Sequence, residues 1–350
     1  MTPMSDVLKH NALLVLPRLR VQNANAISSP LTWGFPAITA FTGLMTALER
    51  RLGAQAGITF YGVGVVCHGF EAQVTQGGYT RSFSLTRNPV LQNGKTAAIV
   101  EEGRVHLDIT LVLDVELDHR YLDDRLRTEL AADIGMLVAG MRIAGGSVMP
   151  PLLGQFRRPP RPTLTILDAQ GRTKEFRRLS RQWLPGFALV GRDDLLDQRL
   201  AELCREWHAL DQTRKDAPPT ALDAWLDLAR LNYFSHRTES EEPVADDEGK
   251  HRAEWATAPR PGWLIPIPVG FAALSGLHPP GSVAGVRDPQ VPFQFVESVY
   301  SVGQWISPHR LGNIRDLMWY PQHDPASGLY RCVNEYKTDP YADLADSSTN

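Results

Sequence analysis

The sequence contains little cysteine, no long apolar run and no large excess of either charge. Three cysteines, Cys67, Cys204 and Cys332, lie far apart among 350 residues, which disfavours a disulfide framework or a zinc finger. Such low cysteine usage fits a reducing compartment, so we expect a cytoplasmic protein. No apolar stretch reaches the ~20 residues needed to cross a bilayer, and no signal peptide is recognisable, so secreted and membrane classes are not expected. The net charge is only −3, so nucleic-acid binding would have to come from local patches.

Sequence motifs of the common enzyme classes are also missing. The chain has no Walker A loop, dinucleotide glycine fingerprint, His-Glu-x-x-His pair or Gly-x-Ser-x-Gly elbow. The adjacent Cys67 and His68 would point to opposite faces of a strand, which disfavours a metal site or a nucleophilic dyad. His106 is interpreted as a solvated residue on the polar face of a strand. We therefore expect no metal and no cofactor.

Strand and helix signals alternate along the first half of the chain. Apolar residues recur at every second position in the strand signals and at every third or fourth position in the helix signals. The order is strand, helix, strands, helix, strand, which is the split βαβ, ferredoxin-like pattern of RNA-recognition folds. The sequence therefore predicts an α+β fold with a modified ferredoxin-like palm over residues 10–190. The signals are strands at residues 13–22, 105–117 and 186–190 and helices at residues 38–52 and 122–141.

Three further regions are predicted around and after this palm. Residues 77–103, with Asn93-Gly94 as a hairpin-turn signal, are expected to project from the palm as a thumb hairpin. Residues 191–250 are expected to form a helical segment followed by a linker, because six acidic residues and no basic one lie between positions 239 and 248. The Pro- and aromatic-rich residues 251–333 are expected to pack on the palm. Residues 334–350 are expected to be a disordered tail.

The first predicted strand carries the leading candidates for nucleic-acid binding. In residues 13–22 the odd positions are apolar, which places Arg18, Arg20 and Gln22 together on the other face. Arginine and amide side chains can bind phosphates and read base edges, but a salt-bridged surface strand would show the same pattern. The polar residues that follow could contact RNA or form turns. They are Asn23, Asn25, Ser28 and Ser29.

Other candidates lie later in the chain. Eight Lys or Arg and two acidic residues occur between positions 151 and 181, a composition that favours a surface for phosphate or for an acidic partner. In residues 141–147, two glycines would allow close backbone approach to a ligand, or they would simply end a helix. Trp33 could stack on a base, although burial would also explain it. The residues assigned to RNA binding here are Arg87, Asn88, Arg142, Gly145, Gly146, Ser147, Arg157 and Arg158.

Several segments of this chain together resemble a known protein family. Residues 16–36, which begin Leu-Pro-Arg-Leu and end Ser-Ser-Pro-Leu-Thr-Trp-Gly-Phe-Pro, resemble the second subunit of the type I-F CRISPR Csy surveillance complex. That subunit belongs to the Cas-five branch of the RAMP superfamily. The resemblance runs from about residue 13 to residue 331, and it is weak at 118–127, 210–219, the acidic run and the tail. Further matching segments are residues 67–73, 85–89, 96–104, 184–190, 261–264 and 307–310.

The resemblance implies a non-catalytic role and a set of partners. A member of this family would bind the 5′ handle of the CRISPR RNA, pair with the large Cas-eight-type subunit and cap the filament of Cas-seven-type backbone subunits. It would meet target DNA through the assembled complex, whose guide RNA reads the target sequence by base pairing. Two alternatives stay open. One is a metal-independent endoribonuclease for the precursor guide, with His68 or His106 as general base, and the other is an assembly adaptor that binds no RNA.

Overall fold

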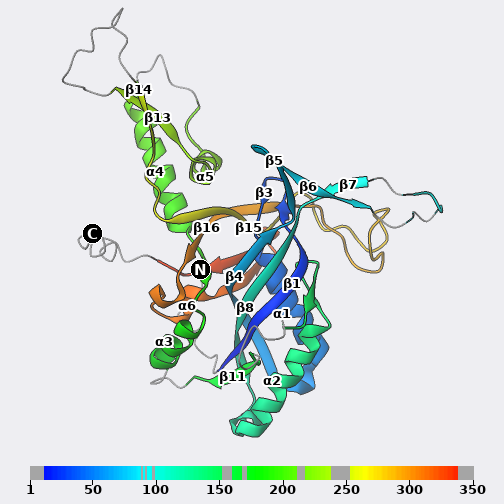
Figure 1. Cartoon of the computed structure of the whole chain (residues 1–350). Coiled ribbons are helices and arrows are strands. Elements are labelled where there is room, and N and C mark those ends of the chain that lie inside the picture. The colour runs from blue at the N-terminus through cyan, green and yellow to red at the C-terminus, as the bar shows by residue number, and fades with distance from the viewer. Residues whose placement is uncertain are drawn as a thin grey trace, which may run out of the picture. The chain divides into compact units, whose positions relative to one another are not determined.

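The computed structural model describes residues 12–87, 90, 93–96, 99–151, 160–167, 172–210, 217–237 and 253–337. The protein is a mixed α/β chain with a large antiparallel sheet and, among the described residues, six α-helices (Figure 1). The chain divides into two compact units. The first unit comprises residues 1–191, 267–300 and 305–350, and the second comprises residues 192–266 and 301–304.

The large sheet has eleven strands, and β1, β8 and β4 form its centre. Its strand order is β12-β16-β15-β18-β17-β4-β8-β1-β10-β9, and β11 also pairs with β1. β15 and β16 each contain residues of both units. The strands are β1 (Ala12–Asn25), β4 (Ile58–Ala72), β8 (Arg104–Leu117), β9 (Arg142–Ile143), β10 (Gly146–Met149), β11 (Thr163–Ile166), β12 (Phe187–Gly191), β15 (Trp263–Ala273), β16 (Val296–Ile306), β17 (Trp319–Asp324) and β18 (Leu329–Asn334).

Two short strands that the sequence does not predict, β10 and β11, pair with β1. A strand does form at β12, but it pairs with β4, with Phe187 opposite Cys67. The position beside β1 is taken by β10 and β11, which follow the second helix directly. Alternation of apolar and polar residues could not reveal these strands in the sequence. β9, β10 and β11 have only two to four residues, which is too short to show a period.

Two helices cover one face of the central strands. In α1 (Ile38–Leu52) the apolar residues recur every three or four positions, and Ile38, Phe41 and Leu48 are fully buried. α1 ends at Gly53, whose φ of 75° lies in the region that favours glycine. α2 (Asp124–Ala139) begins at Asp123, whose carboxylate accepts the amide hydrogens of the first turn. The predicted continuation of this helix beyond Ala139 is wrong. α1 packs on β4, and α2 packs on β10 and β11.

A third helix covers part of the other face. α3 (Arg172–Gln182) buries Phe176 and Leu179, followed by Trp183, in a cluster that includes Leu13 and Val15 of β1. The same cluster contains Val112, the one apolar residue on the otherwise polar side of β8. Val112 breaks the alternation of its strand because this part of the sheet is covered on both faces. The segments after α3 complete the cluster through Leu311, Leu317 and Met318.

A small three-stranded sheet follows β4. It consists of β5 (Val74–Gly77), β6 (Thr80–Arg87) and β7 (Ile99–Glu102), all antiparallel. The predicted thumb hairpin falls on these strands, and part of its tip lies outside the described residues. The short pair β2 (Ile27–Ser29) and β3 (Thr32–Trp33) lies next to it, since the ring of Trp33 packs on Phe83 with centroids 5.8 Å apart.

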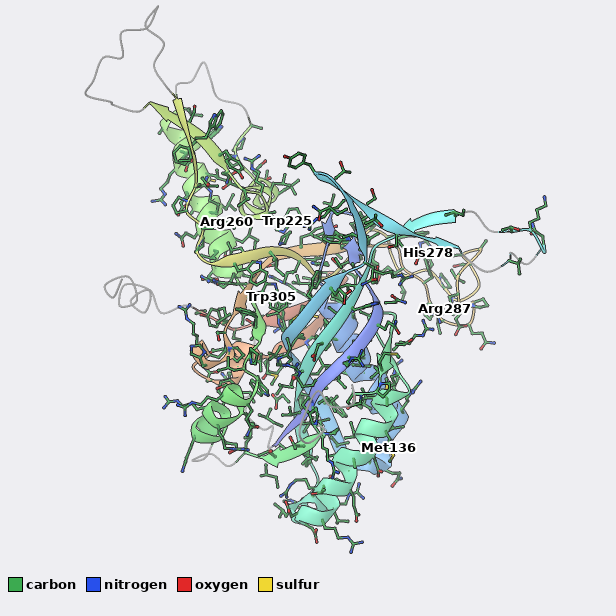
Figure 2. The ribbon with its side chains drawn as sticks, in the orientation of Figure 1. Met136, Trp225, Arg260, His278, Arg287 and Trp305 are labelled. Atoms are coloured by element: carbon green, nitrogen blue, oxygen red, sulfur yellow. The ribbon has the colours of Figure 1, made fainter. Side chains whose placement is uncertain are left out.

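The C-terminal strands are held by a few buried contacts within the first unit. Trp319, 2% exposed, donates its indole hydrogen to the carbonyl of Leu189, and the side chain of Asn334 accepts from the amide of Gly191. Trp305, which is labelled in Figure 2, packs edge-on against Phe35 with centroids 4.9 Å apart. The domain boundaries predicted from the sequence stay predictions. Residues 338–350 of the expected tail lie outside the described residues. Two short turns complete the region, η5 (Pro308–Arg310) and α6 (Ile314–Leu317).

The second unit is built on two helices and a hairpin. α4 (Asp193–Ala209) and α5 (Ala221–Ala229) lie in the predicted helical segment, and α5 begins with a capping box between Thr220 and Asp223. The indole of Trp225 donates to the carbonyl of Ser301, 2.9 Å away. Strands β13 (Tyr233–Arg237) and β14 (Ala253–Thr257) pair on either side of the acidic run, which itself lies outside the described residues.

Two glycines of the first unit allow a matched test of this packing. A Cβ at Gly270 of β15 would overlap the backbone carbonyl oxygen of Tyr330, whereas a Cβ at Gly43 inside α1 would meet nothing within 4 Å. We expect Gly270→Ala to cost about 1–3 kcal/mol of unfolding free energy, because a backbone atom cannot give way easily. Gly43→Ala should instead add about 0.5–1 kcal/mol, since alanine favours a helix interior. Chemical denaturation of both variants tests this, and equal effects would contradict the described strand pairing.

Candidate nucleic-acid interface

A bulge in β1 decides which side chains share a face. Leu16 pairs with Leu111 and Leu19 with Ile109, so β1 has one extra residue between these pairs. Arg18 lies in the bulge with a φ of 53°, and its amide donates to the hydroxyl of Thr110, 3.1 Å away. The expectation that the odd positions of this strand form one continuous face is therefore wrong beyond Leu16. The extra residue shifts the alternation by one.

The bulge places polar side chains on the face that α3 covers further along. After it, Arg18, Arg20 and Gln22 continue the face of Leu13 and Val15, whereas Leu19 and Val21 join the opposite face. Leu13 and Val15 are buried in the cluster under α3, but Gln22 is exposed. One face of the sheet thus has a covered apolar half and an open polar half. The expected grouping of Arg18, Arg20 and Gln22 on one side holds, for a different reason than simple alternation.

Two cross-strand rows form the open half. Directly paired residues of antiparallel strands project to the same side. In the first row, Arg20 lies between Asp108 of β8 and Met149 of β10, and Gly69 of β4 pairs with the same Asp108. In the second row Gln22 pairs with Ser147, and Ser147 pairs with Arg142 of β9. At the other end of that row Glu71 pairs with His106.

The first row, together with Gln22, Glu71 and His106 of the second, lines a shallow hollow in the sheet surface. It measures about 450 Å³, and its lining includes Arg20, Gln22, Glu71 and His106. Gln22, Ser147 and Arg142 are exposed. Arginine, amide and hydroxyl groups in such a row can bind phosphate oxygens and ribose hydroxyls. The β1 and β9–β10 candidates, 120 residues apart in sequence, are therefore brought together.

Arg18 and Arg20 are held more firmly than a free binding group. A guanidinium nitrogen of Arg18 lies 2.8 Å from a carboxylate oxygen of Asp108, with side chains 22% and 19% exposed. Arg20 donates to the carbonyl of Pro150 at 3.0 Å. Arg18 therefore matches the salt-bridged interpretation, since its charge is largely compensated inside the protein. Arg20 keeps part of its guanidinium for a ligand, because a carbonyl does not neutralise its charge.

The residues after Gln22 are used mainly to shape the chain. Asn23 forms a second bulge with a φ of 58°, and its amide donates to the Nδ1 of His106. The side chain of Asn25 exchanges hydrogen bonds with the backbone of Ile27, as in an Asx turn. The hydroxyls of Ser28 and Ser29 each lie 2.7 Å from that of Thr32. These residues thus stabilise the local chain conformation, and their contact with RNA stays a prediction.

The two glycines form a hairpin turn and do not end a helix. Ala144 and Gly145 have φ values of 48° and 78° between the paired Ile143 and Gly146, which is the two-residue turn typical of β-hairpins. A Cβ at Gly146 would lie 2.7 Å from the amide nitrogen of Ala24, so this glycine lets β10 approach β1. Arg142 donates to the carbonyl of Gly145 from the rim of the turn.

The remaining candidates are only partly described. Trp33 is 43% exposed beside Phe83, so one side of its ring stays accessible. Arg87 is the last residue of β6. Asn88, Arg157 and Arg158 lie outside the described residues, so their assignment to RNA binding stays a prediction.

Sequence reasoning missed the polar network that supports this face. His68 lies between the carbonyl of Pro185 and the hydroxyl of Thr110, at 2.7 and 2.8 Å. Because a carbonyl only accepts, Nδ1 carries the hydrogen, and in the neutral ring Nε2 accepts from Thr110. Burial lowers the pKa of His68, outweighing the hydrogen bond to Pro185, which raises it. The polar residues that alternate with apolar ones in residues 105–117 were the sequence signal from which Thr110 and Asp108 could have been found.

Neither histidine resembles a poised catalytic base. Both ring nitrogens of His68 are hydrogen-bonded, and His106 accepts the amide hydrogen of Asn23 through Nδ1. Burial raises the pKa of the neighbouring Cys67 thiol to about 11, which keeps it protonated. Within the described ranges, no group of three His, Cys, Asp or Glu side chains could hold a metal ion. The described helices also include none long and apolar enough to span a membrane.

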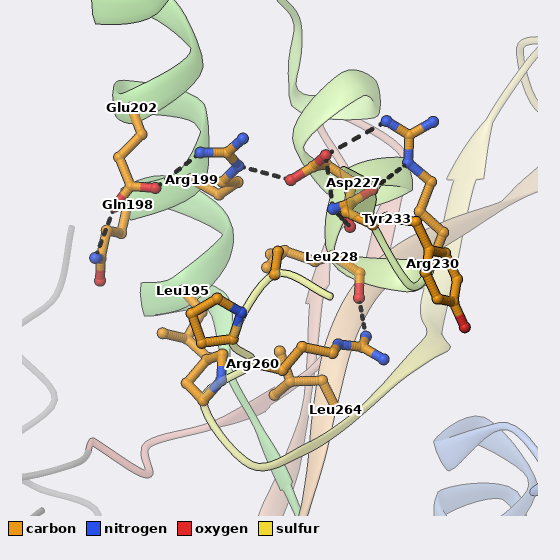
Figure 3. Close-up of a pocket in the computed structure, with 14 residues that line it drawn as sticks. Leu195, Gln198, Arg199, Glu202, Asp227, Leu228, Arg230, Tyr233, Arg260 and Leu264 are labelled. Carbon is orange, nitrogen blue, oxygen red and sulfur yellow. Dashed lines mark hydrogen bonds and ion pairs between the residues drawn. The ribbon is translucent and has the colours of Figure 1, made fainter. Parts of the chain in front are cut away.

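A second hollow, of about 790 Å³, lies in the second unit between α4, α5 and the segment before β15 (Figure 3). Arg199 of α4 reaches Asp227 of α5 at 2.7 Å and Glu202 at 3.0 Å. Arg260 donates to the carbonyl of Leu228 near the end of α5. Arg199 thus ties α4 to α5 through its ion pair with Asp227, and Arg260 is held by a backbone carbonyl.

Comparison with known proteins decides the family. A family model described as CRISPR-associated protein (Cas_Csy2) matches residues 14–332. The CRISPR-associated protein Csy2 of Pseudomonas aeruginosa (strain UCBPP-PA14) is 48% identical over 332 residues, which cover 93% of this chain and 96% of the relative. The chain belongs to the Csy2 family. The resemblance drawn from the sequence motifs is thereby confirmed, and in this Csy2-family chain the open polar half of the sheet is the candidate interface.

The buried histidine of this Csy2-family chain gives a test by pH. Because the pKa of His68 is lowered in the folded protein, the unfolded chain binds a proton more readily. Stability should be complete above the ordinary histidine pKa of about 6.5 and fall as the pH drops below it. We expect His68→Gln to reduce this acid loss, measured by urea unfolding between pH 5 and 8. The difference in unfolding free energy between wild type and His68→Gln at pH 8 gives the part of the mutational cost that does not depend on pH. Parallel curves of unfolding free energy against pH would contradict a buried neutral ring at His68.

The ion pairs of the second unit predict a localised loss of stability. Arg199→Met leaves Asp227, whose side chain is 16% exposed, without its closest cation. Asn232 and Arg230 still contact one carboxylate oxygen of Asp227, so we expect α5 to open more readily by about 1 kcal/mol, the cost of losing the hydrogen bond to the other oxygen. Hydrogen exchange of the α5 amides measures this. Arg205→Met, an exposed change on the same helix, should have little effect, and equal exchange in both variants would contradict the role given to Arg199.

Proposed function

We propose that this protein is a non-catalytic subunit of a type I-F CRISPR surveillance complex that binds the 5′ handle of the CRISPR RNA. Family membership supports a place in the Csy complex. The observation that carries the RNA-binding role is the open polar half of the large sheet, where Gln22, Ser147 and Arg142 form one exposed row. Cytoplasmic location is part of the proposal, and the three free thiols fit it.

The strand order supports a ferredoxin-like palm. β8 lies between β1 and β4, which α1 connects, and β1 lies between β8 and β10, which α2 connects. Each βαβ half is therefore split by a strand of the other, as in the ferredoxin-like pattern. In RNA-recognition folds of this kind one sheet face is left open for bases and phosphates. The β5–β7 sheet is proposed as the thumb, with Arg87 and Asn88 near the RNA.

Within the interface we assign different roles to different residues. Arg20, Gln22, Ser147 and Arg142 contact phosphates or ribose hydroxyls. Arg18 is a positioning residue, because its charge is paired with Asp108 and its backbone forms the bulge. Asn23, Asn25, Ser28 and Ser29 shape the rim, where Trp33 offers a ring for base stacking. Arg157 and Arg158 extend the phosphate contacts beyond β10, and Gly145 and Gly146 keep the turn close to the RNA.

The proposed partners follow from the family. The chain pairs with the large Cas-eight-type subunit, caps the filament of Cas-seven-type subunits and meets target DNA through the assembled complex. Target sequence is read by the guide RNA. The endoribonuclease alternative receives no support from His68 or His106, whose hydrogen bonds are described above. The RNA-free adaptor alternative is separated from our proposal by the RNA-binding experiment.

Charge reversal on the exposed row tests RNA binding. We expect Arg142→Glu together with Gln22→Glu to weaken binding of handle RNA by the purified complex about 10-fold or more. The slope of log K against log salt should become shallower by about 0.7 for each lost phosphate contact. Arg125→Glu, an exposed change on α2 on the opposite face, is the control. Unchanged affinity and slope in the double variant would refute the assignment of this row.

A further inference from the structure

The outer face of α3 carries cations that the handle site does not use. The helix buries Phe176, Leu179 and Ser180, so its other side faces solvent. Lys174, Arg177 and Arg181 are exposed on that side at intervals of three and four residues. This spacing aligns them along one stripe of the helix.

These three cations differ from the ion-paired arginines of the molecule. Arginines such as Arg18, Arg104 and Arg127 are ion-paired with a nearby carboxylate. On α3 itself, Arg178 pairs with Glu175. In the part of the chain that the structure describes, no carboxylate forms an ion pair with Lys174, Arg177 or Arg181. A chain of net charge −3 thus keeps three uncompensated cations together.

The arrangement is unfavourable for the helix alone. Like charges at i,i+4, such as Arg177 and Arg181, destabilise a helix by a few tenths of a kcal/mol. Lys174 lies in the first turn, where the helix dipole disfavours positive charge, whereas Glu175 of the same turn and Arg181 of the last turn suit the dipole. Helix stability thus does not account for the like-charge pair of Arg177 and Arg181, and an external anion would.

The stripe is connected to the handle site by a short chain of contacts. The amide of Leu184 donates to the carbonyl of Arg181, 3.4 Å away. Two residues later, the space beside Gly186 is filled by the ring of His68, which contacts Thr110 and thereby Arg18. The C-terminal end of α3 therefore lies at the border between the covered and the open halves of the sheet face.

We propose that Lys174, Arg177 and Arg181 bind the sugar–phosphate backbone of a nucleic acid, as a contact additional to the handle site. Seven residues of helix span about 10 Å, and one strand places a phosphate every ~3.4 Å along its axis, so three cations match about three phosphates. Protein interfaces rely on buried aromatic or apolar anchors. No large apolar side chain of α3 is among the exposed ones, which favours a nucleic acid over an acidic protein.

The test compares salt dependence for two probes. The full-length protein and its K174Q/R177Q/R181Q variant are titrated against a 20-nucleotide single-stranded RNA and a 20-base-pair DNA duplex, both unrelated to the handle. Loss of three phosphate contacts should reduce the slope of log K against log salt by about 2 for RNA or about 3 for duplex DNA. The probe that shows the reduction identifies the source of the backbone.

Two further variants make the outcome decisive. R50Q/R51Q/R125Q removes three exposed cations from α1 and α2 and should leave both slopes unchanged. R177K/R181K keeps the charge and should behave like the wild type, and glutamine preserves the helix, which circular dichroism verifies. Unchanged slopes in K174Q/R177Q/R181Q, an equal effect of the control, or loss of a protein partner alone would each overturn the proposal. Handle RNA binding is expected to weaken in the variant that carries Arg142→Glu and Gln22→Glu, but to stay unchanged in K174Q/R177Q/R181Q. Failure of this proposal can therefore be distinguished from failure of the proposed handle binding.

Discussion

The hydrogen bond from the amide of Arg18 to the hydroxyl of Thr110 fixes the bulge on which the polar face depends. Without the extra residue in β1, Arg18, Arg20 and Gln22 would project to the side that carries Leu14 and Leu16, under α1 and α2. With it, they extend the face that α3 covers only in part. One backbone donor and one hydroxyl thus allow a single strand to bury both faces at its start and to expose a polar row near its end. Thr110 is 1% exposed, so water cannot replace either partner.

Polar residues of β8 lie in the half of the sheet that other segments cover, and hydrogen bonds inside the protein make their burial possible. Asp114, 6% exposed, accepts a hydrogen bond from the hydroxyl of Tyr320 at 2.9 Å. Burial, followed by the nearby charge of Asp114, raises the pKa of Tyr320, so the phenol remains a donor. A buried carboxylate is tolerated only with such a partner. Thr110 and Asp114, whose alternation would place them in solvent, are therefore buried and hydrogen-bonded, whereas Asp108 and His106 further along the strand are partly exposed.

Much of the fold could be predicted from periodicity, and the failures have specific causes. The helices at α1, α4 and α5 and the long strand β8 were predictable because each has a regular apolar pattern and a recognisable end, such as Gly53 or the Thr220–Asp223 capping box. The bulges at Arg18 and Asn23 were not, because neither residue type signals a positive φ as glycine does. The row that joins Gln22, Ser147 and Arg142 depends on strand pairing, which a single sequence does not encode locally. Candidates such as Asn25 and Ser29 were found by residue type, and their hydrogen bonds give them a mainly structural use.

The distribution of paired and unpaired charge separates the groups that shape the surface from those free to bind. Arg18 and Asp108 are about one fifth exposed, and an RNA phosphate that took the arginine would leave the carboxylate without its cation. That exchange costs more than it gains, so Arg18 stays with Asp108 and holds the edge of the interface. Among the described residues, Arg142 donates to a carbonyl, and Lys174, Arg177 and Arg181 lie on an exposed helix face with no ion-paired carboxylate, which suits them to bind a phosphate. The proposed binding surface therefore follows exposed cations without a described carboxylate partner, and ion-paired arginines such as Arg18 belong to the scaffold around it.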